Sequence, residues 1–558
     1  MKKTKQILSF AGVPVLILMV LAGCGKEEPR QSAQGSNGTA LTAQEEFAAR
    51  SGGVHIGTPE NVGPRPYSES TVYYGSGAAW DSFNPYDTGT MYSLWIIDKI
   101  FDHLAVTSAG GLIVKPRAAD SWESADGGKA IIFHLNPNSK WHDGVPVTAH
   151  DWVFTVNLIS NPETVLSSGN FFRFLEGTDQ QGKALFPGSP KAEALDDHTL
   201  KLTFKNITIP EDFLVTQRNF IAFPEHLLKD VNPAELRSAE FWKNPVGSGP
   251  CIFESELVGS QVVMKANREY HLGQPGFGTL IYNVVANSNL FSSFLAGDID
   301  IFGFGNMVNT EERQIAEQAG FTVADALAKT SFSEIKLNAQ TITSPEIRQA
   351  LHYAVDKEAI SQSRTFGAGI PAAVATMPGS EYFNTSIKVE RDVEKARELL
   401  KKGAYDGRVY TFVADQGRAD AAAICQQNWA EIGFKIDIVV TDAASMLAGF
   451  RDGKYDIAII GHSATADPLW YLSLVKGSDA NGPRDPAYDI LAEEIQKELD
   501  PEKRKKLIWE FQDYVFAQTP WIPLYHQGPK NVISKTLAYV DYNAGQMISD
   551  NAWEWYKP

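Results

Sequence analysis

Hydrophobic and polar residues change their period along this chain, and each period predicts a type of element. Apolar residues in 130–135 predict the second strand of a hairpin whose turn is 125–128, because Asp and Gly tolerate positive φ there. Thr148 then stands where we expect a helix N-cap, and Asp151 three residues later completes a capping box. Apolar residues spaced three or four apart predict a helix over 345–357 that buries one face.

Two helix–strand pairs follow one another between residues 421 and 460. The first helix stops at Gly433, and the second strand is the apolar run 455–460. Two such pairs in succession imply a parallel sheet with right-handed crossovers. Ligands bind at the carboxyl ends of parallel strands, so 461–470 is the candidate ligand loop.

The same patterns predict further elements and more than one domain. The chain has 558 residues, too many for one hydrophobic core, so two or three domains are expected. Further strands are predicted at 71–75, 120–123, 261–264 and 434–438, and a turn followed by an alternating strand at 195–204. Further helices are predicted at 91–100, 291–297, 421–432, 446–453 and 501–517.

The start of the chain has the pattern of an export signal. Three lysines among the first five residues precede the apolar run 7–22, which is short for a membrane span and typical of a signal peptide. The run ends in Leu-Ala-Gly-Cys at 21–24, which resembles a lipoprotein processing site. We therefore expect a signal peptide over 1–23 and a lipid on Cys24, with a simple secretory signal as the alternative.

Residues 24–70 are rich in Gly, Ser, Gln, Glu and Pro, which predicts a flexible tether. No later segment reaches 18 uninterrupted apolar residues, so we expect an exported body anchored by lipid to the cell membrane, on its periplasmic or extracellular face. The formal net charge of −17 argues against a nucleic-acid partner, since phosphate binding needs a basic patch.

Cysteines and histidines limit the chemistry further. Cys251 and Cys425 are expected to be buried thiols, although export would permit a disulfide. The 11 histidines show no metal-ligand spacing, so neither a metal nor a cofactor is expected. Gly461-x-Ser463 could suggest a hydrolase elbow, but Thr465 stands where that motif needs Gly, so no enzyme activity is expected.

Several motifs together resemble a known family. The first set is Trp122, Asp126-Gly127, Phe133-x-Leu135, Trp141-x-Asp143-Gly144 and Thr148-Ala149-x-Asp151. Similar family motifs recur at 244–250, 345–357, 392–400, 433–438 and 520–525. Over about residues 71 to 530 the chain resembles the extracellular solute-binding proteins, family 5, of ABC importers, which include dipeptide- and oligopeptide-binding lipoproteins.

The resemblance implies an α/β, periplasmic-binding-protein-like fold, with two lobes built from three domains, mixed and parallel sheets and a hinge. Domain I would comprise 71–105, 215–330 and 525–558, domain II 106–214, and domain III 331–524. A monomer would close around a peptide and dock on an ABC permease with its ATPase. A chaperone-like or signalling receptor of the same fold stays open.

The ligand loop departs from the pattern of the peptide-binding members. In those members an Asp stands a few residues before an Asp-Pro pair, and this Asp binds the ammonium group of the peptide. This chain has Ala464 and Thr465 at the equivalent positions. A peptide held by its backbone, a cello-oligosaccharide stacked on aromatic rings and, less favoured, a nickel chelate all remain open. The expected ligand-binding residues are Trp80, Asn84, Asn306, Met307, Phe383, His462, Asp467 and Trp470.

Overall fold

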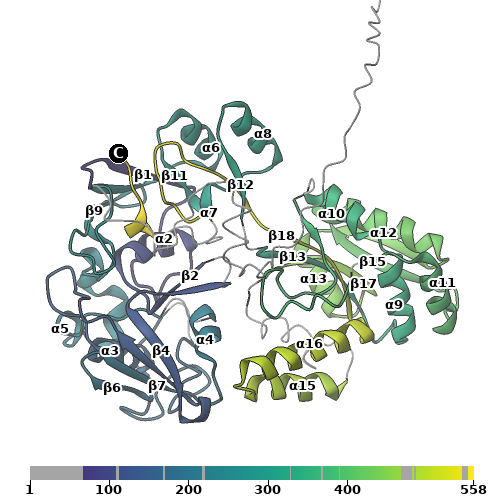
Figure 1. Cartoon of the computed structure of the whole chain (residues 1–558), viewed down its shortest axis with the longest axis horizontal. Helices are drawn as coiled ribbons and strands as arrows, with labels where there is room; N and C mark the ends of the chain where they lie inside the picture. The colour runs from purple at the N-terminus through teal and green to yellow at the C-terminus, as the bar shows by residue number, and fades with distance from the viewer. Residues whose placement is uncertain are drawn as a thin grey trace, which may run out of the picture. The chain divides into compact units, whose positions relative to one another are not determined.

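The computed structural model describes residues 67–108, 112–166, 170–216, 220–326, 329–365, 368–388, 390–464, 466, 481–482, 485–542 and 551–558. Helices and mixed parallel and antiparallel sheets make up this part of the chain (Figure 1). The predicted α/β class is therefore confirmed. Among the described helices, none combines the length and the apolar character needed to cross a bilayer.

The first large sheet has five strands in the order β11-β1-β10-β9-β8. Strand β1 runs parallel to β10 and β11, whereas β9 is antiparallel to both of its neighbours. Helix α2 contacts β8. Gly247 lies against the last residue of α2, and a Cβ at this position would be 1.9 Å from the Ile100 carbonyl oxygen. The strands are β1 (Thr71–Ser76), β8 (Cys251–Leu257), β9 (Gln261–Ala266), β10 (Thr279–Val284) and β11 (Ile301–Phe302).

The second large sheet is antiparallel and contains the predicted hairpin. Its order is β4-β5-β7-β6, and β5 coincides with the predicted strand. Asp126 and Gly127 adopt φ of 51° and 65° in the turn, as their residue types allow. The capping box of Thr148 and Asp151 is also confirmed. The strands are β4 (Ala119–Ala125), β5 (Ala130–Leu135), β6 (Ala192–Asp196) and β7 (Thr199–Thr203).

The third large sheet has six strands in the order β14-β18-β13-β17-β15-β16. Strand β15 runs parallel to β16 and β17, with α12 and α13 in the connections, so the predicted parallel arrangement is confirmed. Strand β13 is antiparallel to β17 and β18. The strands are β13 (Ser331–Leu337), β14 (Ile370–Pro371), β15 (Val409–Asp415), β16 (Lys435–Thr441), β17 (Ile457–Ser463) and β18 (Trp521–Gln527).

The predicted helix over 345–357 is wrong at its end, because the structure breaks it in two. Helix α9 ends at Ala354, and Val355 takes an extended conformation. Asp356 Oδ1 then accepts a bond from the Ala359 N–H, so this side chain caps the next helix, α10. The Asn428 side chain fixes the break by accepting the Asp356 N–H at 2.8 Å.

The remaining elements connect these sheets. The helices are α2 (Met91–Ile100), α3 (Ala149–Ser160), α4 (Pro210–Thr216), α5 (Glu225–Leu228), α6 (Asn287–Ala296), α7 (Gly303–Asn306), α8 (Thr310–Gln318), α9 (Pro345–Ala354), α10 (Lys357–Thr365), α11 (Val393–Lys402), α12 (Ala419–Glu431), α13 (Ala443–Arg451), α15 (Pro486–Lys497) and α16 (Pro501–Gln518). The remaining strands are β2 (Ala105–Ser108), β3 (Ile113–Pro116), β12 (Val323–Asp325) and β19 (Lys530–Val532). The 3₁₀ helices are η3 (Asp126–Gly128), η4 (Pro233–Ser238), η5 (Glu240–Lys243), η6 (Gln416–Arg418) and η7 (Ala552–Glu554).

Hydrophobic packing groups the first two sheets together and keeps the third apart. One core contains Tyr74 of β1 together with Phe133 of β5. A separate core contains Ile335, Phe412 and Trp429 of the six-stranded sheet and its helices. This grouping fits one lobe from domains I and II and another from domain III, while the domain boundaries stay predictions. Cys251 and Cys425 are buried free thiols, as expected.

The two chain crossings between these cores lie side by side. Strands β12 and β19 pair antiparallel, and the Ala326 N–H donates to the Pro529 carbonyl at 2.9 Å. Beyond them, Ser331 of β13 pairs with Gln527 of β18. The crossing segments near 330 and 525 are therefore hydrogen-bonded to each other.

Candidate ligand-binding site

Aromatic rings line one edge of the six-stranded sheet, at the carboxyl end of β17. His462 of β17 is paired in register with Phe332 of β13, which is paired in turn with His526 of β18. The ring centroids of His462 and Phe332 are 6.4 Å apart, and those of Phe332 and His526 are 4.9 Å apart. The predicted site residue His462 therefore belongs to a row of three rings across three strands.

A buried carboxylate lies beside this row. Glu334 is fully buried, and its Oε1 lies 2.9 Å from His462 Nε2. Its other oxygen, Oε2, is buried without a hydrogen-bond partner in the described part of the chain. Such an acceptor is costly to leave unpaired, which makes Glu334 a candidate to bind a donor supplied by a ligand.

An arginine stands at the carboxyl end of the neighbouring parallel strand. Arg418 pairs with Asp415, the last residue of β15. Its guanidinium lies against the backbone of Gly461, where an added Cβ would be 2.5 Å from Nη2. The Arg418 side chain is 31% exposed, so it can donate to a ligand as well as to Asp415.

Sequence reasoning did not select Arg418, Asp415 or Glu334. The rule that named the loop after β17 applies equally to the end of β15, so Asp415 and Arg418 could have been found. A signal for Glu334 was also present, because an acidic residue interrupts the otherwise strand-like run at 331–337.

Trp80 packs in the lobe that contains the five-stranded sheet. Its indole N–H donates to Glu256 Oε2 at 3.1 Å, and its ring lies 6.1 Å from Phe83 and 6.3 Å from Tyr282, centroid to centroid. The side chain is partly buried. A role as a stacking surface stays a prediction, but its N–H already has a protein partner.

Two predicted ligand-binding asparagines are fully buried and bond to the main chain. Asn84 Oδ1 accepts from the Tyr86 N–H at 3.0 Å. Asn306 Oδ1 accepts from the Phe302 N–H at 2.7 Å, and its Nδ2 donates to the Val532 carbonyl at 2.9 Å. Asn306 therefore shapes its loop through both amide atoms, whereas Asn84 Nδ2 is buried without a hydrogen-bond partner in the described part of the chain. Direct ligand contact by either residue remains a prediction.

The other predicted residues are separate from these. Met307 follows α7 and is 42% exposed, and Phe383 is partly buried in the loop between β14 and α11. No contact recorded among the described residues joins Trp80 or Asn84 to Phe383 or His462. Cys24, Asp467 and Trp470 lie outside the described residues.

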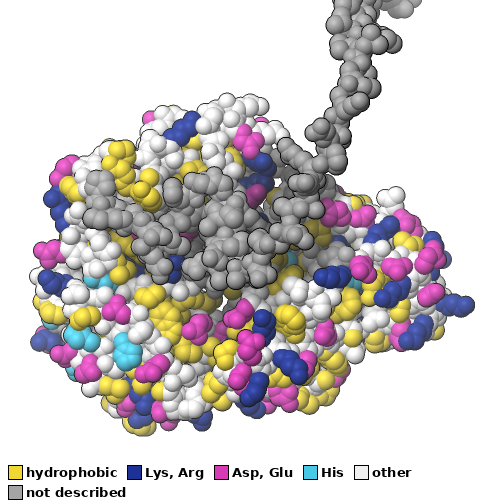
Figure 2. All heavy atoms as spheres, viewed as in Figure 1, with side chains coloured by type: hydrophobic (Ala, Val, Ile, Leu, Met, Phe, Trp, Pro, Cys, Tyr) yellow, Lys and Arg dark blue, Asp and Glu magenta, His cyan; other side chains and the backbone are white. Residues whose placement is uncertain are grey.

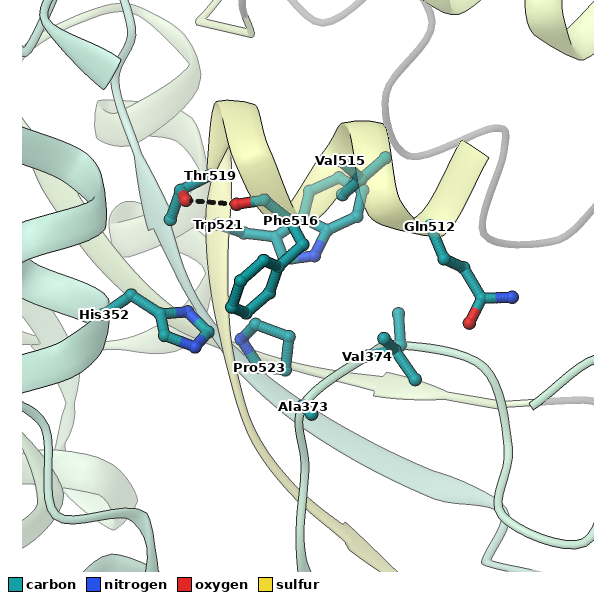
Figure 3. Close-up of a pocket in the computed structure, with 10 residues that line it drawn as sticks. His352, Ala373, Val374, Gln512, Val515, Phe516, Thr519, Trp521 and Pro523 are labelled. Atoms are coloured by element: carbon teal, nitrogen blue, oxygen red, sulfur yellow. Dashed lines mark hydrogen bonds between the residues drawn. The ribbon is translucent and has the colours of Figure 1, made fainter. Parts of the chain in front are cut away.

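A small hollow lies elsewhere, between α16 and β18 (Figure 3). Its polar side chains already have protein partners: Thr519 donates to the Phe516 carbonyl at 2.7 Å, and Gln512 donates to the Tyr382 carbonyl at 2.7 Å. Mainly apolar side chains form the rest of its wall, so it has the character of a packing gap. Within the described residues, no three His, Cys, Asp or Glu side chains gather as a metal site requires.

Exposed charges say less about ligand binding than the buried ones. On the face shown in Figure 2, acidic and basic side chains are interspersed with hydrophobic ones. Exposed pairs such as Lys243–Glu240 are worth little, because water and salt screen them. Glu334 is buried and the Arg418 side chain is 31% exposed, so these two charged residues indicate a ligand site at the six-stranded sheet better than the exposed pairs do.

Comparisons with known proteins place this geometry in context. The chain is 28% identical to heme-binding protein A of Haemophilus influenzae over 500 residues, covering 82% of this chain and 87% of that protein. It is 26% identical to di/tripeptide-binding protein 1 of Pseudomonas aeruginosa over 514 residues, covering 85% and 92%.

Solved structures share the fold. The substrate-binding protein CtaP of Listeria monocytogenes aligns with a TM-score of 0.72 at 22% identity, covering 88% of this chain and 99% of that one. The unliganded open form of the murein tripeptide-binding protein MppA aligns with a TM-score of 0.76 at 18% identity, covering 89% and 99%. The family model of the bacterial extracellular solute-binding proteins, family 5, matches residues 114–483, and the chain belongs to that family.

Proposed function

We propose that this protein is the solute-binding component of an ABC importer and that its ligand is a peptide. The match to the family of solute-binding proteins over 114–483 carries the proposal. Di/tripeptide-, dipeptide- and oligopeptide-binding proteins are among its relatives, which favours a peptide. The protein accordingly binds its solute and does not transform it.

The charges at the edge of the six-stranded sheet suit a peptide's two termini. Arg418 supplies a guanidinium that can donate to a terminal carboxylate, and charge-assisted bonds of this kind are the strong ones. The unpartnered oxygen of Glu334 supplies an acceptor for an ammonium or a backbone N–H. Closure of the two lobes around the peptide would bury these pairs and so strengthen them.

The N-terminal residues support a location at the membrane. A lipid on Cys24 and the tether over 24–70 would hold the protein at the membrane, near the permease and ATPase that receive its ligand. The open alternatives, an oligosaccharide, a nickel chelate or heme, enter the test as competing ligands.

The test is a thermal-shift screen of the purified chain against pools of di- to nonapeptides, cello-oligosaccharides, heme and nickel–histidine. A ligand at 100 times its Kd adds about 2.7 kcal/mol of stability, which is easily detected. We expect the peptide pool to raise Tm. A response confined to any of the other three ligands would overturn the peptide assignment.

A second experiment tests the role of Arg418. Arg418→Met should weaken binding of a responsive peptide by about 10- to 100-fold, because a hydrogen bond to a charged group contributes about 1.5–3 kcal/mol. The same peptide with an amidated carboxyl end should show a much smaller loss. Arg451→Met, at an exposed position on α13, is the matched control. An equal loss for both peptides would contradict a carboxylate partner.

A further inference from the structure

One buried ion pair joins residues that are 292 positions apart and belong to different cores. Arg504 of α16 donates through Nη2 to Asp212 Oδ2 of α4 at 2.5 Å. Helix α4 packs on β2, β3 and β4, whereas α16 packs on α15 and α9 (Figure 1). The pair therefore connects the predicted domain II to the predicted domain III.

Arg504 is held in place by its own side of this contact. Its Nη1 donates to Tyr382 Oη at 3.2 Å, its Nε donates to the Ile495 carbonyl at 3.4 Å, and the guanidinium lies 5.6 Å from the centre of the Tyr382 ring. Only 2% of the Arg504 side chain is exposed. Contacts within the predicted domain III therefore hold the guanidinium in place without help from Asp212.

The opposite side presents one carboxylate to it. Asp212 is 13% exposed in its side chain. Its neighbour Glu211 accepts a hydrogen bond from Trp122 Nε1 at 3.0 Å. Glu211 thus has its own partner, and Asp212 is the carboxylate of α4 that pairs with Arg504.

A second contact between the same two domains lies close by in the chain. Leu499, just before α16, lies against Gly128 of the β4–β5 hairpin, where an added Cβ would be 2.7 Å from Leu499 Cδ2 and 3.0 Å from Ile207 Cγ2. Gly128 also has a φ of 85°, which favours glycine. The absence of a side chain at this position lets the two surfaces touch.

From these contacts we infer that Arg504 and Asp212 form a reversible latch that favours the arrangement in which domains II and III touch. This inference rests on the proposed function, in which the lobes close around a ligand. The inference assigns a role to two residues outside the candidate ligand site, which would set the fraction of molecules in which the two lobes touch. Removing either charge leaves its partner buried and unpaired, which disfavours contact.

The electrostatics fit a latch that releases. Desolvation raises the pKa of the Asp212 carboxyl above its ordinary value, although Arg504 acts to lower it. The loss of water around Asp212 therefore opposes the attraction between the two charges, although Asp212 still acts to raise the pKa of Arg504. A contact of this kind selects one arrangement without locking it.

The experiment measures distances between spin labels in the full-length chain without ligand. Leu195→Cys and Ile490→Cys place labels at exposed positions in domains II and III. Cys24→Ser removes the one other sequence position that could be labelled, since Cys251 and Cys425 are buried. Circular dichroism and Tm confirm that each variant is folded.

The test variants are Arg504→Met, the conservative Asp212→Asn, and the double variant Arg504→Met/Asp212→Leu. Each single change should reduce the short-distance population at least threefold, and the double variant should recover part of that loss. Lys506→Met, on the exposed face of α16, and Glu163→Gln, at an exposed position of the predicted domain II, are matched controls that should leave the population within experimental error.

An unchanged distance distribution in both single variants would overturn the latch, as would an equal change in the controls. The latch would also be overturned if the double variant lost as much of the short-distance population as the two single variants lose together. Because no ligand is added, the outcome is independent of the peptide screen. A latch-dependent distribution in a protein that ignores peptides would refute the peptide assignment alone.

Discussion

Lys357 is a buried amine whose removal should change how stability depends on pH. Its Nζ donates to the Ala372 carbonyl at 2.8 Å and lies 3.2 Å from His352 Nε2. No carboxylate pairs with it among the described residues. Burial therefore lowers the pKa of Lys357 to about 7, and it keeps the pKa of His352 well below its ordinary value.

The magnitude follows from the difference between the folded and unfolded pKa of this amine. Between pH 7 and about 10.5 the unfolded chain holds the Lys357 proton and the folded chain does not. The free energy of unfolding should therefore rise with pH through this window, by about 1.4 kcal/mol per unit at most. Below pH 7 the penalty is complete, at roughly 5 kcal/mol.

The assay is urea unfolding of the wild type and of Lys357→Met at pH 7.0, 8.0 and 9.0. Loss of the bond to the Ala372 carbonyl lowers stability by about 1–3 kcal/mol at every pH, so the slope is the diagnostic quantity. From pH 7 to 9 the wild type should gain about 2–3 kcal/mol relative to the variant. Lys506→Met, at a site with a 79% exposed side chain, should track the wild type. A difference between wild type and Lys357→Met that stays constant with pH would refute the reasoning.

Three further outcomes are expected. Trp429→Ala should lower the free energy of unfolding by about 3–5 kcal/mol in urea, since the ring is fully buried, and a loss below about 1 kcal/mol would contradict this. Gly247→Ala should lower Tm far more than Gly89→Ala, because a Cβ at 247 would strike the Ile100 carbonyl, whereas a Cβ at 89 would meet only an ordinary contact at 3.7 Å; similar shifts would argue against the clash at 247. In a Cys24→Ser chain, both described cysteines should resist a thiol reagent at pH 8 until denaturant is added, and rapid labelling of the native protein would show that they are accessible.

Local patterns predicted most elements because their causes lie within a few residues. The β5 hairpin depends on a turn that Asp126 and Gly127 can adopt, and the start of α3 depends on a capping box. The break between α9 and α10 was not predicted. Part of its cause is Asn428, 72 residues away, whose side chain accepts the Asp356 N–H. Periodicity alone cannot reveal a partner at that distance.

The candidate site was less predictable for the same physical reason. Asn306 has a residue type suited to ligand binding, yet its amide bonds Val532, 226 positions away, and its own φ is 52°. Glu334 and His462 meet only because β13 and β17 pair across 128 positions. The sequence offers the residue types, but only the pairing of the strands decides which polar groups are satisfied within the protein.

The paired crossings described above constrain how the protein can move. Since β12 and β19 are hydrogen-bonded, as are β13 and β18 beyond them, the two crossings are held together at both ends. In a two-stranded antiparallel ribbon the hydrogen bonds run perpendicular to the strands and tie them together. We expect this ribbon to act as a hinge that permits rotation of the lobes about one axis and resists twisting between them. Opposing surfaces of the two lobes would then return to the same register in every cycle of opening and closing.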